Sequence, residues 1–309
     1  MTVTSKFQDA LPYLPPELRL PLSRLSRPDE IREIRLRLGR PMQVICGHEA
    51  FTVAAAGSCI PPEQTGILVT RPMLDSCFQS ICAHSVHSWQ PAIRQGFITI
   101  AGGCRVGLCG TAVIQNNRIE TLRNISGMNF RIASERLGCA ELLFSRIKRD
   151  LQTGGLLIAG APSSGKTTIL RDLSRLLGDM HKVCILDERG EIAAVQNGIP
   201  QFSLGTQTDI FDGYPKADGL AIAVRVMSPE FLICDEIGDE AETEHLLHAL
   251  HTGVRIIAAA HAGSLQELKM RPQIKKLLDA DVFRCLVMLG SGAQCGQVLT
   301  MEHWKGTGI

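Results

Sequence analysis

The sequence predicts an α/β protein in two parts, a smaller α+β domain followed by a domain with a mostly parallel sheet. Two observations lead to this fold class. A glycine-bounded loop at residues 160–168 lies between an apolar strand and an amphipathic helix, and apolar strands then alternate with helical patterns, as a parallel sheet requires. Before this loop, period-two strands, one long helix and a hairpin dominate. We place the domains at residues 1–145 and 146–309.

The loop reads Gly-Ala-Pro-Ser-Ser-Gly-Lys-Thr-Thr and has the spacing of a phosphate-binding loop. Its two glycines allow successive N–H groups to converge on an anion, which also meets the positive end of the following helix. We expect Lys166 to reach the β- and γ-phosphates of a nucleotide, and the Thr167 hydroxyl to hold Mg²⁺. The residues expected to bind the nucleotide are Gly160, Ala161, Pro162, Ser163, Ser164, Gly165, Lys166, Thr167 and Thr168.

Composition limits the class of protein. The chain has 309 residues, is 45% hydrophobic and carries a net charge of +1, so no nucleic-acid partner is expected. No signal peptide or apolar segment of membrane-spanning length is evident, which favours a cytoplasmic protein. The eleven cysteines include no Cys-x-x-Cys pair, and we interpret Cys77, Cys82, Cys104 and Cys109 as core thiols of a reducing compartment.

The front half begins with a Pro- and Leu-rich stretch. Alternating apolar and arginine residues predict a strand over 33–40, and further strands are expected at 42–46 and 51–55. Helical spacing covers 71–88, and a hairpin with a glycine pair at its turn covers 96–113.

Two arginines of the front half are candidate phosphate contacts. Arg105 lies on the second strand of the hairpin, and Arg131 lies in a later apolar stretch. An arginine offered by a neighbouring domain can neutralise charge on a γ-phosphate. An ordinary surface arginine explains each position equally well.

In the back half, two apolar strands end in acidic residues. The strand at 183–186 leads into Asp187, Glu188 and Glu191, and the strand at 231–234 leads into Asp235 and Glu236. Because the carboxyl ends of parallel strands line the ligand crevice, we expect these carboxylates near the phosphates. One acid of the second pair, Asp235, is the candidate Mg²⁺ ligand, and Glu236 is a candidate for polarising the attacking water. Asp239 follows one turn later.

The remaining segments continue the alternation. A helix is predicted at 242–251, then a strand at 254–260 with His261 at its tip. There a neutral imidazole can hydrogen-bond the γ-phosphate or the attacking water. Ser264 and Glu267 form a capping box that opens the next helix, and the last strands are expected at 283–289 and 297–300.

These motifs resemble those of the ATPases that drive type II and type IV secretion and type IV pili. The matching segments are residues 160–168, 187–191, 235–239 and 251–261. More closely, the chain is similar to the mother-cell sporulation ATPases of endospore-forming bacteria. This resemblance covers nearly the whole chain, and its more specific strings lie in the front half, at residues 33–41, 93–100 and 103–107.

The resemblance implies a RecA-like P-loop ATPase domain that binds ATP and Mg²⁺. It also implies a homo-hexameric ring, with an arginine such as Arg105 offered by the neighbouring subunit. The implied partners are membrane proteins of a sporulation channel between mother cell and forespore, to which the ATPase docks from the mother-cell cytoplasm. The four-cysteine metal insertion of many type II enzymes is missing, so no zinc is expected.

One departure leaves the general base open. Secretion ATPases have a glycine before the glutamate of the acidic strand tip, where this chain has Asp235. Glu236, Glu188 and Glu191 therefore all remain candidates for activating water. Two other function classes also remain: a nucleic-acid-dependent ATPase of the recombinase or helicase kind, and a nucleotide-gated scaffold with negligible turnover.

Overall fold

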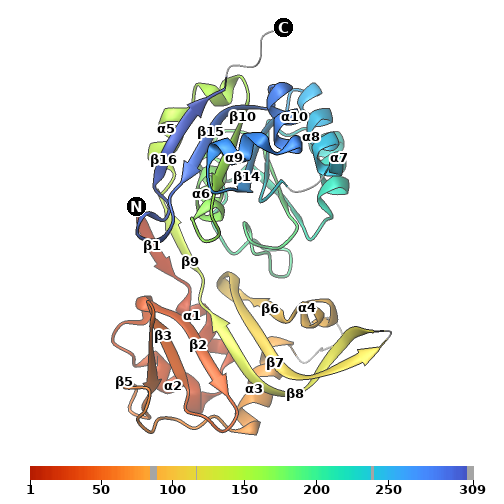
Figure 1. Ribbon diagram of the computed structural model, residues 1–309. Helices are drawn as coiled ribbons and strands as arrows, with labels where there is room; N and C mark the ends of the chain where they lie inside the picture. The colour runs from red at the N-terminus through yellow and green to blue at the C-terminus, as the bar shows by residue number, and fades with distance from the viewer. Residues whose placement is uncertain (84–88, 116, 238–239, 305–309) are drawn as a thin grey trace. The chain divides into compact units, whose positions relative to one another are not determined.

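The computed structural model describes residues 1–83, 89–115, 117–237 and 240–304. By its contacts the chain falls into a first unit, Val3–Glu135, and a second unit, Met1–Thr2 with Arg136–Ile309 (Figure 1). The division falls within the short strands β1 (Thr2–Ser5) and β9 (Ser134–Leu137), which pair in a two-stranded sheet. The expected domain boundary at residue 145 stays a prediction. The helix expected over 71–88 ends at Ile81, with Cys82 as its C-cap, so its predicted length was too great. Residues 84–88 of that prediction lie outside the described residues.

The first unit is built on a seven-stranded antiparallel sheet, in the order β5-β4-β3-β2-β8-β7-β6. Its strands are β2 (Ile31–Arg37), β3 (Gln43–Cys46), β4 (Glu49–Val53), β5 (Cys59–Ile60), β6 (Phe97–Ile100), β7 (Cys104–Gln115) and β8 (Arg118–Arg131). Its helices are α1 (Phe7–Ala10), α2 (Pro16–Ser23), α3 (Arg71–Ile81) and α4 (Gln90–Gln95). The strands predicted at 33–40, 42–46 and 51–55 correspond to β2, β3 and β4.

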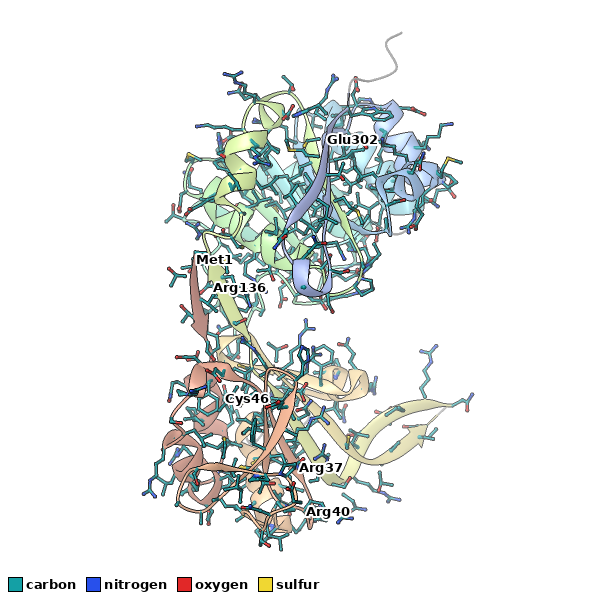
Figure 2. The ribbon with its side chains drawn as sticks, turned by 60° about the vertical axis from the view of Figure 1, so that its left-hand side comes forward. Met1, Arg37, Arg40, Cys46, Arg136 and Glu302 are labelled. Atoms are coloured by element: carbon teal, nitrogen blue, oxygen red, sulfur yellow. The ribbon has the colours of Figure 1, made fainter. Side chains whose placement is uncertain are left out.

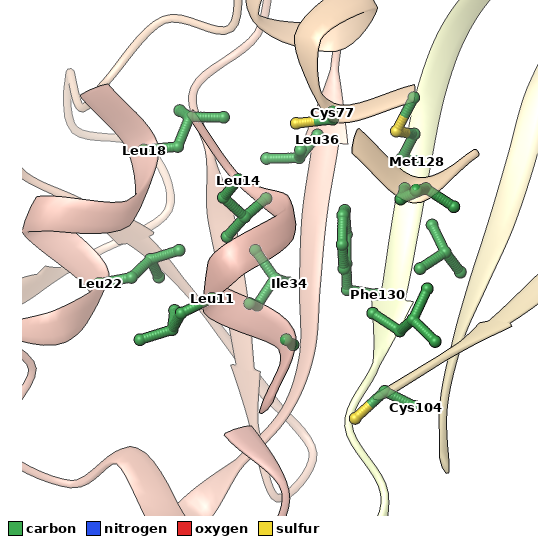
Figure 3. Packing of buried hydrophobic residues seen from close by; sticks show 14 of the residues in the cluster. Leu11, Leu14, Leu18, Leu22, Ile34, Leu36, Cys77, Cys104, Met128 and Phe130 are labelled. Atoms are coloured by element: carbon green, nitrogen blue, oxygen red, sulfur yellow. The ribbon is translucent and has the colours of Figure 1, made fainter. Parts of the chain in front are cut away.

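One face of this sheet forms the core of the first unit. Ile34 and Leu36 of β2 are fully buried beside Phe130 of β8, and Leu18 and Leu22 of α2 belong to the same apolar cluster (Figure 3). The alternate side chains of β2, Arg35 and Arg37, lie outside this core. Arg37 and Arg40 mark the end of β2 and the turn after it (Figure 2). The period-two pattern therefore correctly predicted the buried face of β2.

The hairpin of the first unit is confirmed, with one correction. β6 and β7 pair antiparallel, and Gly102 adopts a left-handed φ of 71° in the turn between them. Cys77, Cys82 and Cys104 are buried as expected, but Cys109 is exposed. From Cys109 onward β7 pairs only with β8 and extends beyond the body of the sheet (Figure 1). Little of the unit therefore covers this stretch, and the interpretation of Cys109 as a core thiol was wrong.

The second unit contains a seven-stranded sheet in the order β12-β11-β13-β14-β10-β15-β16. Its strands are β10 (Gly155–Gly160), β11 (Val183–Asp187), β12 (Thr208–Asp212), β13 (Phe231–Cys234), β14 (Arg255–His261), β15 (Phe283–Leu289) and β16 (Val298–His303). All neighbours are parallel except the β15–β16 pair. The apolar strands predicted from the sequence form the middle of this sheet.

Helices cover both faces of the second sheet. The elements are α5 (Glu141–Ile147), α6 (Lys166–Gly178), α7 (Lys216–Met227), α8 (Glu240–His251), α9 (Leu265–Met270) and α10 (Pro272–Asp279). One apolar cluster packs α5 and α6 against one face of the sheet. A second cluster packs the four helices α7, α8, α9 and α10 against the other face. The capping box is half confirmed: Ser264 Oγ accepts from Glu267 N, but the Glu267 carboxylate accepts from Gly263 N. In the part of the chain that the structure describes, no helix combines the length and apolar character needed to cross a bilayer.

Gly155 at the start of β10 tests how tightly the second sheet is packed. A Cβ atom there would overlap the carbonyl oxygens of Ile256 and Val282 on the neighbouring segments. We expect Gly155→Ala to lower the free energy of unfolding by about 1–3 kcal/mol, because a crowded backbone must shift to admit the methyl group. Urea unfolding measures this loss.

Gly107→Ala is the control, because its Cβ would approach Asn129 only at 3.9 Å. An equal loss in both variants would show that crowding around Gly155 is not the cause.

Candidate functional site

The strand order brings the predicted functional segments to one edge of the second sheet. β14 lies between β10 and β13, and all three run in the same direction. The loop at 160–168 follows β10, His261 ends β14 opposite Gly160, and Asp235 and Glu236 follow β13. Residues far apart in sequence therefore meet at the carboxyl ends of adjacent strands, as this sheet type predicts.

The loop backbone has the curvature that its glycines predict. Gly165 has a φ of 92° and Ser163 a φ of 59°, both left-handed. A Cβ at Gly160 would overlap the Ser164 hydroxyl, so this position needs glycine. The loop is supported from behind, since Gly296 N donates to Ser164 O at 2.9 Å. The loop therefore packs against the turn before β16, a support that the sequence did not predict.

The features of this loop fit a phosphate. α6 begins at Lys166, with Gly165 as its N-cap and no side chain accepting from its first N–H groups. The Ser164 hydroxyl is buried and has no partner among the residues that the structure describes. Free donors at the positive end of a thirteen-residue helix are what an anion requires.

Lys166 is held inside the loop by backbone oxygens. Its side chain is almost fully buried, and Nζ donates to Gly160 O at 3.0 Å and to Ala161 O at 2.9 Å. Burial lowers the pKa of Lys166, although the carboxylates of Glu236 and Asp235 oppose this shift. The ammonium thus has two acceptors that a phosphate oxygen can replace.

His261 links Lys166 to the acidic side of the site. Its Nδ1 lies 3.0 Å from Lys166 Nζ, and its Nε2 lies 3.8 Å from Glu236 Oε1. Because an ammonium can only donate, Nδ1 must accept, which leaves the proton of a neutral imidazole on Nε2. His261 therefore connects Lys166 to Glu236, so that a movement of the Lys166 ammonium can alter the position of the imidazole beside Glu236.

Thr167 and Asp235, the two residues expected to hold Mg²⁺, lie in contact with each other. Thr167 Oγ1 donates to Asp235 Oδ1 at 3.3 Å. The pKa of Asp235 is raised to about 6, first by burial and then by the charges of Glu191 and Asp187, against the lowering effect of the Thr167 hydrogen bond and of Lys216. A hydroxyl and a crowded carboxylate are a donor set that suits Mg²⁺, and a bound cation would relieve the repulsion.

Asp187 has a structural position. Its carboxylate is fully buried and accepts from Glu191 N at 2.7 Å, Ile192 N at 3.1 Å and Ala193 N at 2.7 Å. These bonds hold the loop that carries Glu191, and Glu191 in turn acts electrostatically on Asp235. Asp187, the last residue of β11, therefore fixes the backbone of the following loop.

Lys216, at the start of α7, is a site residue that the sequence analysis missed. Its side chain is only 9% exposed, and Nζ donates to Glu236 O at 2.6 Å. The same ammonium lies 3.9 Å from Glu188 Oε2 and 3.8 Å from Glu242 Oε1. No motif surrounds Lys216, and only its position at the head of an apolar helix could have drawn attention to it.

The two candidate arginines lie side by side in the first unit. Arg105 of β7 is the register partner of Arg131 of β8, and its guanidinium lies 5.0 Å from the centroid of the Phe97 ring. The role expected for Arg105 at a neighbouring subunit's nucleotide stays a prediction. Gly238 and Asp239, expected to complete the tip after β13, lie outside the described residues.

Comparisons with known proteins agree on a family. The family model for sporulation stage III, protein AA, matches residues 10–309. The curated stage III sporulation protein AA of Bacillus subtilis (strain 168) is 37% identical over 278 residues, which cover 87% of this chain and 86% of that protein.

Two solved structures share the fold at low sequence identity. The Legionella pneumophila ATPase DotB matches with a TM-score of 0.54 at 14% identity, over 84% of this chain and 72% of that one. The pilus retraction motor PilT, solved with bound ADP, matches with a TM-score of 0.57 at 14% identity, over 88% and 76%. The expected RecA-like fold with a largely parallel sheet and a separate N-terminal sheet is therefore confirmed.

The raised pKa of Asp235 predicts a pH-dependent stability. Between the ordinary value of 3.8 and the folded value of about 6, the folded state keeps a proton that the unfolded state has lost. The free energy of unfolding therefore falls as pH rises through this window, by up to ~3 kcal/mol. We expect Asp235→Asn to be more stable than the parent at pH 8, with the difference vanishing near pH 4, in urea unfolding with chelator and without nucleotide.

The exposed Asp209 supplies the control, because Asp209→Asn removes a carboxylate outside the cluster. A gain for Asp235→Asn that stays the same from pH 4 to pH 8 would contradict the electrostatic account.

Proposed function

The chain belongs to the family of sporulation stage III protein AA, and from this premise we propose that it is a Mg²⁺-dependent ATPase of a secretion-like, envelope-associated channel complex in endospore formation. The observation that carries the proposal is the meeting of Lys166, His261 and Glu236, with Thr167 and Asp235 beside them. A phosphate-binding lysine, a pair of oxygen ligands and a partly exposed carboxylate are the parts that phosphoryl transfer to water needs.

The loop residues 160–168 would hold the triphosphate of ATP. Lys166 would exchange the oxygens of Gly160 and Ala161 for phosphate oxygens, which also form charge-assisted hydrogen bonds. Thr167 and Asp235 would hold Mg²⁺, which neutralises charge on the β- and γ-phosphates when bound. When Lys166 turns to the phosphates, the carbonyl groups of Gly160 and Ala161 would lose this hydrogen-bond donor.

Among the three candidate bases, we favour Glu236. Its side chain is 30% exposed, and it lies between the imidazole of His261 and the guanidinium of Arg189, each at 3.8 Å. Glu188 is instead paired with Lys216, and Glu191 lies on the loop that Asp187 holds. A carboxylate open to water and aligned by a neutral imidazole is suited to orient the attacking water.

The remaining parts of the proposal rest on the family. We place the protein in the mother-cell cytoplasm, as a homo-hexamer docked on membrane proteins of the channel. Residues 1–145 would act as the domain that closes over the nucleotide and contacts partners, and Arg105 would reach the nucleotide of the neighbouring subunit. The similarity to stage III sporulation protein AA supports the sporulation setting.

Turnover of ATP by the purified full chain tests the proposal. We expect Lys166→Ala to reduce Mg²⁺-dependent turnover to background, because no other described group replaces its contact with the phosphates. Glu236→Gln should keep nucleotide binding but lower turnover by roughly 100-fold or more, as loss of a general base does. Phosphate release and nucleotide affinity are measured in parallel.

The exposed Lys182 provides the matched control, and Lys182→Ala should turn over ATP like the parent. Unchanged turnover in Lys166→Ala would rule this site out. A parent without turnover that still binds ATP would favour the nucleotide-gated scaffold, and steep stimulation by single-stranded DNA would favour the nucleic-acid ATPase.

Lys216 gives a second test of the site. Lys216→Met keeps the length of the buried side chain but removes the donor to Glu236 O and the partner of Glu188. We expect kcat to fall on the order of ten-fold or more, because Glu236 loses its backbone anchor, while ATP affinity changes little. Equal losses in kcat and in affinity would instead point to a general collapse of the site.

A further inference from the structure

A second group of chemically active side chains lies away from the loop and its acids. Asp150 opens the short helix η5 (Asp150–Gln152), Cys285 lies on β15, and His303 ends β16. One donor atom from each of these residues lies within 4.8 Å of the others. None of the three belongs to the candidate nucleotide site.

The sheet itself fixes two of these donors. Cys285 and His303 are direct register partners on the antiparallel strands β15 and β16, so both side chains stand on the same face. Asp150 meets them from η5, where its Oδ1 lies 3.0 Å from His303 Nδ1. Three separate elements therefore converge on one point.

The surroundings of the group are closed on one side and open on the other. Cys285 is fully buried in the apolar cluster under α5 and α6. The Asp150 side chain is 21% exposed and that of His303 is 53% exposed. The group can therefore be reached from solvent through Asp150 and His303.

We propose that Asp150, Cys285 and His303 bind a zinc ion. A sulfur, an imidazole nitrogen and a carboxylate oxygen are all zinc ligands, and three of them leave a fourth position for water. Tetrahedral zinc sets such ligand atoms about 3.3–3.6 Å apart, and the three donors here already lie within 4.8 Å of one another. The sulfur and nitrogen donors disfavour Mg²⁺ and Ca²⁺, which prefer oxygen.

The bound ion would act as a clip within the second unit. η5 leads directly into β10, the strand before the phosphate-binding loop, and β16 is the last strand of the sheet. Ligation would join these two segments through β15. The expectation of no zinc came from a missing four-cysteine insertion, which does not bear on three donors so far apart in sequence.

Cobalt binding tests the proposal with a readout independent of ATP turnover. The full chain, stripped of metal with a chelator, is titrated with Co²⁺, and Zn²⁺ is then added as a competitor. We expect a thiolate-to-cobalt charge-transfer band with the intense visible bands of four-coordinate cobalt, and loss of both on adding zinc. Zinc should also raise the melting temperature.

His303→Gln should weaken Co²⁺ and Zn²⁺ binding by ten-fold or more, and Asp150→Asn should act in the same direction. Both positions are partly exposed, so these variants are expected to fold. Cys285→Ser should remove the charge-transfer band, and Cys184→Ser, at another buried thiol, should keep it.

His181→Gln is the matched control, because His181 Nδ1 also lies 3.0 Å from a carboxylate, that of Glu230. This variant should bind cobalt like the parent. A parent without a thiolate band, or a band unchanged in His303→Gln, would overturn the proposal and leave an ordinary histidine–aspartate hydrogen bond above a core thiol.

Discussion

The rest of this site depends on the hydrogen bonds that hold one buried ammonium group at the edge of a parallel sheet. Lys166 is almost fully buried, and its charge is satisfied by two loop carbonyls and by His261. Desolvation of this charge would be costly without such partners. The loop itself supplies the two carbonyl groups. The strand order β13-β14-β10 supplies the third partner, because it places His261 between the loop and the acids.

The acids around this cation differ in role because they differ in environment. The Asp187 carboxylate accepts hydrogen bonds from backbone N–H groups, whereas Asp235 lies near other carboxylates and has a raised pKa. Glu236 remains partly exposed beside His261, and Lys216 anchors its backbone from the other side. The five carboxylates of this cluster thus divide into a structural clamp (Asp187), a candidate metal ligand (Asp235) and three candidate bases (Glu188, Glu191 and Glu236).

Much of the fold and part of the site could be predicted from the sequence, for physical reasons. Continuous apolar runs such as 156–159 and 231–234 identify buried parallel strands, and the side chains that follow them must share one edge. Lys216 could not be predicted, because its role comes from the packing of α7 and not from any local pattern. The exposure of Cys109 could not be predicted, because it depends on β6 pairing with β7 only as far as Gly107 while β8 continues beyond it. The trio of Asp150, Cys285 and His303 likewise exists only through the register of β15 and β16.

The central claim is that Lys166 and the acids after β13 act around one magnesium-bound triphosphate. A crystal structure of the full chain with Mg²⁺ and a non-hydrolysable ATP analogue tests it most directly. The account predicts that Lys166 Nζ leaves Gly160 O and Ala161 O for a phosphate oxygen, with the metal on the Thr167 and Asp235 side. A nucleotide bound elsewhere, with Lys166 still on both carbonyl groups, would contradict the account.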